Sequence, residues 1–235
     1  MLRLLEHYTS VQGEGPKTGV LTQFVRFAGC NLKCPLWPCD TPEAIDPKLY
    51  REEQQNVSPL DIRKTAEDFW QDEMAYNVCL TGGEPMLQNK TALDILVGLL
   101  RDGGFEVEMF SNGTLHYTPK ILRHVDIVMD WKLPGSGEDS HDSTRRQNLK
   151  ALIESSGTRK HVIKFTCASE DDLHAAVSIY EQHDLQHRWP EDIYIGPVWG
   201  KLDPKTVVEF MKAHQLDWKL NLQTHKYIYG NVRSV

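Results

Sequence analysis

Three cysteines close together near the start of the chain are the residues whose type and spacing most plainly indicate chemistry. They lie in the segment Cys30-Asn-Leu-Lys-Cys34-Pro-Leu-Trp-Pro-Cys39. Thiolates grouped in this way bind a soft metal ion or an iron–sulfur cluster. Structural zinc normally takes four ligands, whereas a cluster held by three cysteines leaves one iron open to another ligand. The spacing alone leaves three alternatives: a cluster, structural zinc and three incidental thiols.

A second motif, Thr81-Gly82-Gly83-Glu84-Pro85, follows an apolar run that predicts a strand. Paired glycines allow a ligand to approach the backbone closely, and the adjacent carboxylate can accept a hydrogen bond from an ammonium group. A tight turn before a helix would give the same letters. The cysteine triad followed one strand later by this turn favours cofactor binding more than either motif does alone.

Alternating apolar and amphipathic segments predict the elements that position these motifs. We expect strands at residues 22–27, 77–81, 105–110, 126–130, 162–166, 192–195 and 218–222, and helices at 58–71, 91–101, 118–123, 147–154, 169–183 and 204–214. Such alternation predicts an α/β fold with a parallel sheet of about six strands and flanking helices, either open or part of a barrel. Ligands gather at the carboxyl ends of the strands in both architectures, and the two motifs fall there. Residues 40–57 are expected to leave the sheet.

Composition restricts the classes of protein further. The chain has 235 residues, 40% of them hydrophobic and 25% charged, which suits one globular domain spanning 1–235. The net charge of −7 disfavours direct nucleic-acid binding. No apolar run is long enough for a membrane span and the first residues do not form a secretory signal, so we expect a cytoplasmic protein with no membrane partner. Cysteines there serve metal binding or catalysis more often than disulfides.

Further motifs occur in a fixed order along the chain. They are Val11-Gln12-Gly13-Glu14-Gly15, Val25-Arg26-Phe27-Ala28-Gly29-Cys30, Cys39-Asp40-Thr41, Thr81–Pro85, Asn112-Gly113-Thr114 and Leu222-Gln223-Thr224-His225-Lys226-Tyr227. From about residue 6 to residue 230 this order resembles the 7-carboxy-7-deazaguanine synthases, a radical S-adenosylmethionine (SAM) family. The Gln-Gly-Glu-Gly and Gln-Thr-His-Lys-Tyr motifs belong to that family, whereas the cysteines and Gly-Gly-Glu-Pro belong to its wider superfamily.

The resemblance implies a partial (β/α) barrel of the radical SAM type, a 4Fe–4S cluster, SAM and Mg²⁺. It implies a lyase in which reductive cleavage of SAM gives a 5′-deoxyadenosyl radical that abstracts hydrogen from 6-carboxy-5,6,7,8-tetrahydropterin. Ring contraction with loss of ammonia then gives 7-carboxy-7-deazaguanine, which feeds 7-deazapurine nucleosides such as queuosine in tRNA. An electron donor such as flavodoxin or ferredoxin, and a homodimer, are also implied.

Site residues follow from the resemblance position by position. The cluster ligands are Cys30, Cys34 and Cys39, and Thr41 matches a position that touches Mg²⁺. The substrate site is expected to comprise Val11, Gln12, Gly13, Glu14, Arg26, Thr81 and His225. SAM contacts are expected from Gly82, Gly83, Glu84, Asp130, Trp131, Lys132, Gly196, Pro197, Val198 and Trp199.

Physical arguments accompany two of these assignments, and three of the assigned residues have a structural alternative. A guanidinium such as Arg26 suits a substrate carboxylate, and Glu14 suits the N–H edge of a pterin. Alternatively, Glu14 is a solvated turn residue, Arg26 pairs with a structural carboxylate, and His225 is an ordinary strand-end histidine. Cys79 and Cys167 lie inside predicted strands and are expected to be buried structural thiols.

The chain also departs from the pattern that it resembles. The family spaces its cysteines as Cys-x3-Cys-x2-Cys, whereas this chain has Cys-x3-Cys-x4-Cys, and we expect the two added residues to bulge outward. Phe110 occupies a position that usually carries glutamate. Two other readings remain: an enzyme resembling the glycyl-radical activases, and a non-catalytic zinc-binding relative. The activase-like enzyme would not need the Gln-Gly-Glu-Gly or Gln-Thr-His-Lys motifs, and the zinc-binding relative would have lost the cluster.

Overall fold

The computed structural model describes residues 1–37, 39–138, 142–155, 159–189, 193–230 and 232, and their strands form one sheet. Its nine strands lie in the order β3-β1-β2-β4-β5-β6-β7-β8-β9. From β2 onward every pair is parallel. These strands are β2 (Leu21–Phe27), β4 (Asn77–Gly82), β5 (Glu106–Ser111), β6 (Asp126–Trp131), β7 (Val162–Cys167), β8 (Ile193–Pro197) and β9 (Lys219–Leu220). The predicted α/β fold with a parallel sheet is therefore confirmed, and the last strand is shorter than expected.

Two antiparallel strands that the sequence pattern did not predict extend the sheet beyond β2. The first, β1 (Leu2–Val11), pairs antiparallel with β2, and β3 (Gln55–Val57) pairs antiparallel with β1. Charged and polar residues interrupt the apolar alternation of β1, and most of its side chains are only half-buried. The expectation that residues 40–57 leave the sheet was wrong for their last three residues, which return as β3 after α1 (Pro42–Ile45) and α2 (Pro47–Glu53).

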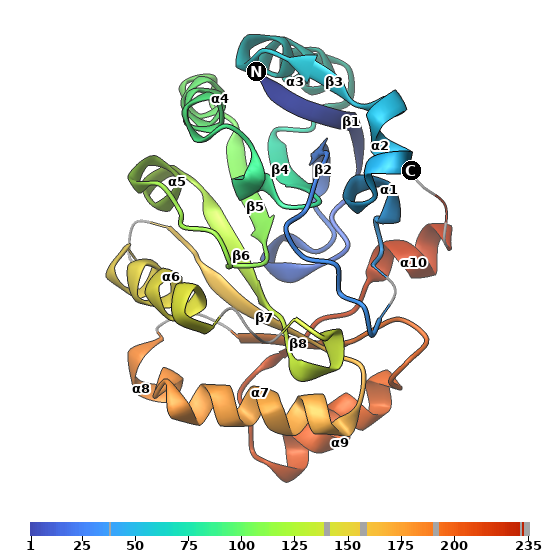
Figure 1. Cartoon of the computed structure of the whole chain (residues 1–235), viewed down its shortest axis with the longest axis vertical. Coiled ribbons are helices and arrows are strands. Elements are labelled where there is room, and N and C mark those ends of the chain that lie inside the picture. Colours follow the sequence, from blue (N-terminus) through green and yellow to red (C-terminus); the bar gives the residue numbers. More distant parts are fainter. Residues whose placement is uncertain (38, 139–141, 156–158, 190–192, 231, 233–235) are drawn as a thin grey trace.

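Helices connect the parallel strands and cover the outer face of the curved sheet (Figure 1). They are α3 (Pro59–Glu73), α4 (Lys90–Asp102), α5 (Pro119–His124), α6 (Asp142–Ser155), α7 (Glu170–Gln182), α8 (Leu185–Arg188) and α9 (Pro204–Ala213), with short 3₁₀ turns at Gly15–Lys17, Pro85–Leu87 and Pro134–Ser136. Ser58 caps α3 in a reciprocal capping box with Asp61. Ser169 caps α7 by accepting a hydrogen bond from the backbone of Asp172.

The main hydrophobic core lies between the sheet and these helices. Leu80 and Met109 from the strands are fully buried together with Leu93 and Leu96 from α4. The opposite, concave face of the sheet carries polar side chains. The strands β3 and β9 end the strand order without pairing to each other, so the sheet does not close into a full barrel. Helix α10 (Thr224–Tyr229) lies on this unclosed side (Figure 1). The fold is thus a partial barrel.

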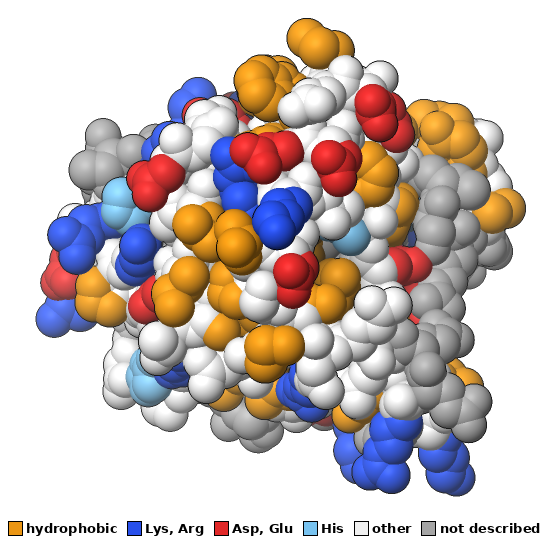
Figure 2. Space-filling model, turned by 90° about the horizontal axis from the view of Figure 1, so that it is seen from above, with side chains coloured by type: hydrophobic (Ala, Val, Ile, Leu, Met, Phe, Trp, Pro, Cys, Tyr) orange, Lys and Arg blue, Asp and Glu red, His pale blue; other side chains and the backbone are white. Residues whose placement is uncertain are grey.

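The outer surface carries both signs of charge. On the face drawn in Figure 2, Asp and Glu side chains lie among Lys and Arg, with hydrophobic side chains exposed between them. None of the helices in the described part of the chain has the length and apolar character needed to span a membrane.

Candidate active site

A cavity of about 700 Å³ opens at the carboxyl ends of the parallel strands. Most of the residues that the sequence assigned to a site line it: Val11, Gln12, Gly13, Glu14, Arg26, Cys30, Cys34, Cys39, Thr41, Thr81, Gly82, Gly83, Asp130, Lys132, Val198, Trp199 and His225. Four assigned residues lie elsewhere: Glu84, Trp131, Gly196 and Pro197. The topology therefore gathers segments from both ends of the chain around one hollow.

The three clustered cysteines follow β2 and border the cavity as partly exposed thiols. The sulfur of Cys30 accepts a hydrogen bond from the backbone of Leu32 at 3.4 Å and lies 3.8 Å from the side-chain nitrogen of Asn112. Burial raises the pKa of Cys30 to about 12 and also raises that of Cys34. Half-buried thiols of this kind become thiolates only beside a strong positive charge.

Three cysteines are a donor set that suits a 4Fe–4S cluster with one iron left open, whereas structural zinc normally takes four ligands. Among the described residues, no three His, Cys, Asp or Glu side chains are grouped closely enough to hold one metal ion. Zinc needs its ligands around one point, whereas each thiolate of a cluster binds a different iron. The other two cysteines, Cys79 and Cys167, are buried in β4 and β7, as predicted. Cys79 also contributes to the cavity wall.

The lengthened segment between Cys34 and Cys39 bulges outward only in part. Leu36 is 62% exposed, but Trp37 is only 7% exposed and lines the cavity. The ammonium of Lys132 lies 5.2 Å from the centroid of the Trp37 ring, within the range of a cation–π contact. Pro38 lies outside the described residues. The extension thus adds an aromatic wall to the cavity, which the sequence analysis did not anticipate.

The glycines of Gly-Gly-Glu-Pro let two backbone segments pack together. A Cβ atom on Gly82 would lie 2.2 Å from the carbonyl oxygen of Phe27, and one on Gly83 would lie 2.1 Å from that of Gly29. The backbone of Glu84 donates to the carbonyl of Gly29 at 2.9 Å. These contacts fix the cysteine loop against the end of β4. The two glycines therefore allow one backbone segment to pack against another, in addition to any approach by a ligand.

Glu84 lies behind the cavity wall. Its carboxylate is fully buried and accepts hydrogen bonds from the backbone of Met86 at 2.9 Å, the hydroxyl of Ser111 at 3.0 Å and the backbone of Asn112 at 2.7 Å. Burial raises the pKa of Glu84 to about 7, although these hydrogen bonds oppose the rise. Ser111 and Asn112 line the cavity, so Glu84 acts on it by positioning them.

Glu14 is the best-anchored acid in the cavity. One carboxylate oxygen accepts from the side-chain nitrogen of Gln223 at 2.9 Å, and the other contacts the ammonium of Lys164. Burial alone would raise the pKa of Glu14, but the charge and hydrogen bond of Lys164 outweigh it and lower that pKa to about 2. Glu14 is therefore not a solvated turn residue. Lys164 was not among the residues expected from the sequence, where its only signal was a lysine inside the apolar run of β7.

The Gln-Gly-Glu-Gly and Gln-Thr-His-Lys motifs meet directly. The backbone of Thr224 donates to the carbonyl of Gly13 at 3.0 Å, and a Cβ atom on Gly13 would lie 2.1 Å from Nδ1 of His225. Gln223 also reaches Asp40, at 2.6 Å, and Lys226 lies 2.6 Å from the same carboxylate. Helix α10 is thus tied both to the N-terminal loop and to the residue that follows the last cysteine of the triad.

Arg26 points into the cavity from β2 but also has partners of its own. Its Nε contacts the carboxylate of Glu6, and one terminal nitrogen donates to the hydroxyl of Tyr8 at 2.8 Å. A guanidinium has five N–H donors, and these contacts use two. Arg26 lies beside Thr81 in the register of β2 and β4. Arg26 therefore does pair with a structural carboxylate, that of Glu6, as one alternative expected. Its remaining N–H donors could still bind a ligand carboxylate.

The side chain of Gln12 is held by a hydrogen bond to a residue of β5. Its side-chain nitrogen donates to the carboxylate of Glu108 at 2.5 Å, and Asn77 donates to the same oxygen at 3.3 Å. Glu108 is buried two residues before Phe110 on the same face of the strand, and Phe110 lines the cavity. At the position where the family that the sequence resembles usually has glutamate, this chain places the ring of Phe110 at the cavity. The glutamate of this strand, Glu108, is buried two residues earlier.

The three consecutive residues Asp130, Trp131 and Lys132 divide between two environments. Asp130 and Lys132 line the cavity and form an ion pair of 2.8 Å, whereas Trp131 is buried in the core against His183. Successive side chains of a strand point to opposite faces, which accounts for the division. Oδ1 of Asp130 and the hydroxyl of Thr166 are buried without a hydrogen-bond partner among the described residues, so this wall can accept a polar ligand.

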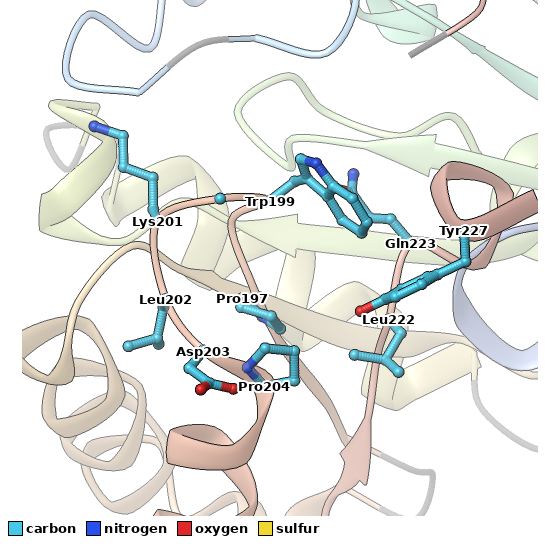
Figure 3. Close-up of a pocket in the computed structure, with 10 residues that line it drawn as sticks. Pro197, Trp199, Lys201, Leu202, Asp203, Pro204, Leu222, Gln223 and Tyr227 are labelled. Atoms are coloured by element: carbon cyan, nitrogen blue, oxygen red, sulfur yellow. The ribbon is translucent and has the colours of Figure 1, made fainter. Parts of the chain in front are cut away.

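The segment after β8 separates the main cavity from a smaller one. A Cβ atom on Gly196 would lie 1.9 Å from the carbonyl oxygen of Asn221, so this glycine allows the chain after β9 to pack closely. Pro197 borders a second cavity of about 420 Å³, and Trp199 borders both. Figure 3 shows Trp199, Gln223 and Tyr227 on one side of this second cavity and Leu202, Asp203 and Pro204 on the other.

Thr41 stands at the start of α1, two residues after Cys39. Its hydroxyl donates to the carbonyl of Gly82 at 3.3 Å and lies 3.6 Å from the sulfur of Cys39. The side chain makes no capping hydrogen bond to α1. Its oxygen lines the cavity and retains its acceptor lone pairs for a ligand.

Comparisons with known proteins agree with this geometry. The 4Fe-4S single cluster domain family matches residues 11–153. The crystal structure of QueE from Escherichia coli has the same fold, with a TM-score of 0.68 and 22% identity over 94% of this chain and 92% of that one. The partial barrel, the three cysteines and the polar cavity beside them define a radical SAM enzyme with a 4Fe–4S cluster.

Full-length relatives identify the family. The 7-carboxy-7-deazaguanine synthase of Clostridium acetobutylicum is 36% identical over 99% of both chains. That of Hyperthermus butylicus is 40% identical over 97% of this chain and 92% of its own. The chain belongs to the 7-carboxy-7-deazaguanine synthase family.

Proposed function

We propose that this protein converts 6-carboxy-5,6,7,8-tetrahydropterin into 7-carboxy-7-deazaguanine with loss of ammonia. The observation that carries the proposal is the contact between the two family-specific motifs. Gln223 binds Glu14 at 2.9 Å and Thr224 binds Gly13 at 3.0 Å, at a cavity that Cys30 also borders. An enzyme acting on a protein glycine would have no need of this arrangement.

The cofactors would occupy the side of the cavity nearest the cysteines. Cys30, Cys34 and Cys39 would hold the 4Fe–4S cluster, and SAM would lie along the ends of β4 and β6. When bound, they supply the radical that removes a hydrogen atom from the substrate. The unpartnered polar atoms of Asp130 and Thr166 support a polar cofactor at this wall.

The substrate lies on the other side, between β2 and α10. Glu14 would accept hydrogen bonds from the N–H edge of the pterin, because its carboxylate is held ionised and oriented. Arg26 would bind the substrate carboxylate through its remaining N–H donors. Gln12, Thr81 and His225 complete this wall. Helix α10 borders this side of the cavity through His225, Lys226 and Tyr229, and the protein would supply the positioning that the chemistry of the cofactors requires.

The remaining assignments rest on the family relationship. Mg²⁺ would bind between the Thr41 hydroxyl and substrate oxygens. The proposed electron donor is a small redox protein such as flavodoxin or ferredoxin. We also propose a single radical SAM domain over residues 1–235, a homodimer and a cytoplasmic location, with no direct contact to nucleic acid or membrane. Light scattering of the purified protein tests the dimer.

An anaerobic assay tests the function. Reconstituted protein is incubated with SAM, dithionite and 6-carboxytetrahydropterin, and products are identified by mass spectrometry. We expect 7-carboxy-7-deazaguanine from the wild type and none from Cys39→Ala, whereas Cys167→Ala, a buried thiol away from the cavity, retains activity. SAM cleavage without consumption of the pterin would favour an activase-like enzyme. Colourless protein with bound zinc would favour a non-catalytic relative.

A further inference from the structure

Lys164 lies at the centre of the charged groups in the cavity. It projects from β7 opposite Asp130 of β6, and its side chain is only 8% exposed. Its ammonium contacts one oxygen of Glu14 and lies 3.7 Å from Oδ2 of Asp130. The ring of Phe110 lies 5.7 Å from the same nitrogen. Lys164 thus separates the acid on the substrate side from the acid on the SAM side.

The two acids differ in how they are neutralised. Asp130 has a second cation, Lys132, at 2.8 Å. For Glu14, Lys164 is the one lysine or arginine that forms an ion pair with it among the described side chains. Glu14 and Asp130 are 13% and 16% exposed, and two largely buried carboxylates that share a cavity repel each other. Such a carboxylate without a cation takes up a proton more readily. The ionised form of Glu14 therefore depends on Lys164 far more than that of Asp130 does.

We propose that Lys164 is a positioning residue that holds Glu14 ionised and oriented, so that Glu14 can accept hydrogen bonds from the N–H groups of a heterocyclic substrate. The inference rests on the proposed function for the substrate alone. Oε1 of Glu14 accepts from Gln223 and keeps an acceptor position for a ligand, whereas Oε2 contacts Lys164 and also accepts from the side chain of Asn221 at 3.4 Å. A protonated Glu14 would instead present a donor to the donor edge of the substrate.

Substitution of Lys164 separates charge from packing. Lys164→Gln keeps a hydrogen-bond donor and removes the charge, whereas Lys164→Arg keeps both. In the glutamine variant the pKa of Glu14 rises because burial and the neighbouring Asp130 are no longer offset. The other titratable groups facing Glu14 are His225, whose pKa burial lowers, and, beyond Gln223, Asp40 with its partner Lys226. None of these lies in ion-pair contact with Glu14, so none replaces the lost charge.

The first measurement is the affinity of the reconstituted, SAM-loaded enzyme for the carboxypterin as a function of pH. At pH 7 we expect Lys164→Gln to bind roughly ten- to hundredfold more weakly, the loss of one charge-assisted hydrogen bond. Binding should recover as the pH rises and Glu14 ionises, and Lys164→Arg should stay close to wild type. Arg159→Gln, which breaks an ion pair with Asp126 at the amino end of β6, is the matched control and should bind normally.

The second measurement needs no substrate, so it stands even if the proposed function fails. Urea unfolding compares the wild type with Lys164→Gln at several pH values. A buried acid whose folded pKa is raised loses stability as the pH rises through that pKa. The stability difference between the two proteins should therefore grow from pH 5 to pH 8. A difference that does not change with pH, or weakened binding that neither higher pH nor arginine restores, would overturn the proposal.

Discussion

Gly13 and His225 are in direct contact, although they come from opposite ends of the chain. A Cβ atom on Gly13 would lie 2.1 Å from Nδ1 of the imidazole and 3.0 Å from the backbone nitrogen of His225. The glycine therefore sets how closely α10 approaches the N-terminal loop. The same loop carries Glu14, so the position of α10 and the position of the acid are coupled.

Gly13→Ala should displace α10 and weaken substrate binding. The added methyl group meets ring atoms and backbone that cannot both move away, so we expect KM for the carboxypterin to rise at least about tenfold, equivalent to roughly 1.4 kcal/mol. Iron content and SAM cleavage without substrate should be unchanged. Gly98→Ala is the matched control, because its methyl group meets only the end of the Lys120 side chain and alanine favours the helix. Equal KM values for wild type and Gly13→Ala would show that α10 does not shape the substrate site.

Arg26→Lys should retain the positive charge and lose the planar fork. The guanidinium already serves Glu6 and Tyr8, and only its forked geometry leaves donors for a second carboxylate. We expect a clear rise in KM for the carboxypterin, of the order of the roughly 1.5–3 kcal/mol that a hydrogen bond to a charged group contributes. Steady-state kinetics and thermal unfolding together decide the role. A lower melting temperature with an unchanged KM would leave Arg26 as a partner of Glu6 alone.

The sequence predicted the alternating strands and helices well because their apolar periods are strong and their caps are local. It missed β1, whose Glu6 and His7 interrupt the apolar pattern while the strand is still stabilised by pairing with β2. It grouped Trp131 with its neighbours because a linear motif does not show that alternate residues of a strand face opposite ways. Because the side chains of a strand alternate between its two faces, the burial of Trp131 could have been predicted from the sequence.

The contacts within the site could not be predicted in the same way. The motifs indicated which residues belong to the site, but the ion pair between Glu14 and Lys164 joins segments far apart in the chain. A lysine within the apolar run of β7 is a weak signal by itself. The tie between Asp40 and Lys226 likewise depends on where α10 lies after folding. Pairings of this kind are set by the topology of the sheet and not by local sequence.

His161 should make the protein less stable at mildly acidic pH. Its ring is fully buried, accepts from the backbone of Ile127 at 3.3 Å and lies 3.1 Å from the hydroxyl of Ser155. Burial lowers the pKa of His161 from 6.5 to about 4, although Asp126 opposes this. Between these two values the unfolded chain binds a proton that the folded chain does not, so stability falls as the pH drops from 6.5 towards 4.

His161→Asn should remove this contribution while retaining an acceptor for Ile127. The slope of unfolding free energy against pH should decrease by up to about 1.4 kcal/mol per pH unit in that window. Urea unfolding of the apoprotein between pH 4 and 7 measures it. His7 is half-buried, and desolvation lowers its pKa to about 4, so part of the wild-type slope will remain. His116→Asn, at an exposed position, should leave the slope as it is; an undiminished slope in His161→Asn would contradict the assignment.

Thr41→Val tests the proposed magnesium site. Magnesium gives up its water reluctantly and usually takes one or two protein ligands together with substrate oxygens and waters. A lone hydroxyl beside Cys39 would therefore bind the ion well only when the substrate completes the coordination shell. Substrate and magnesium should then tighten each other's binding by the same factor. Valine keeps the shape of threonine and removes the oxygen, so this mutual tightening should disappear.

The structure also gives Thr41 a second role that the experiment must separate from the first. Its hydroxyl donates to the carbonyl of Gly82 at 3.3 Å, and loss of that bond alone would cost about 1 kcal/mol of stability. Titration of the carboxypterin into the SAM-loaded wild type and valine variant, each with and without magnesium, distinguishes the two roles. A purely structural threonine predicts a lower melting temperature and an undiminished magnesium effect. A threonine that binds the ion predicts that magnesium no longer strengthens substrate binding, while iron content and SAM cleavage persist because the cysteines are untouched.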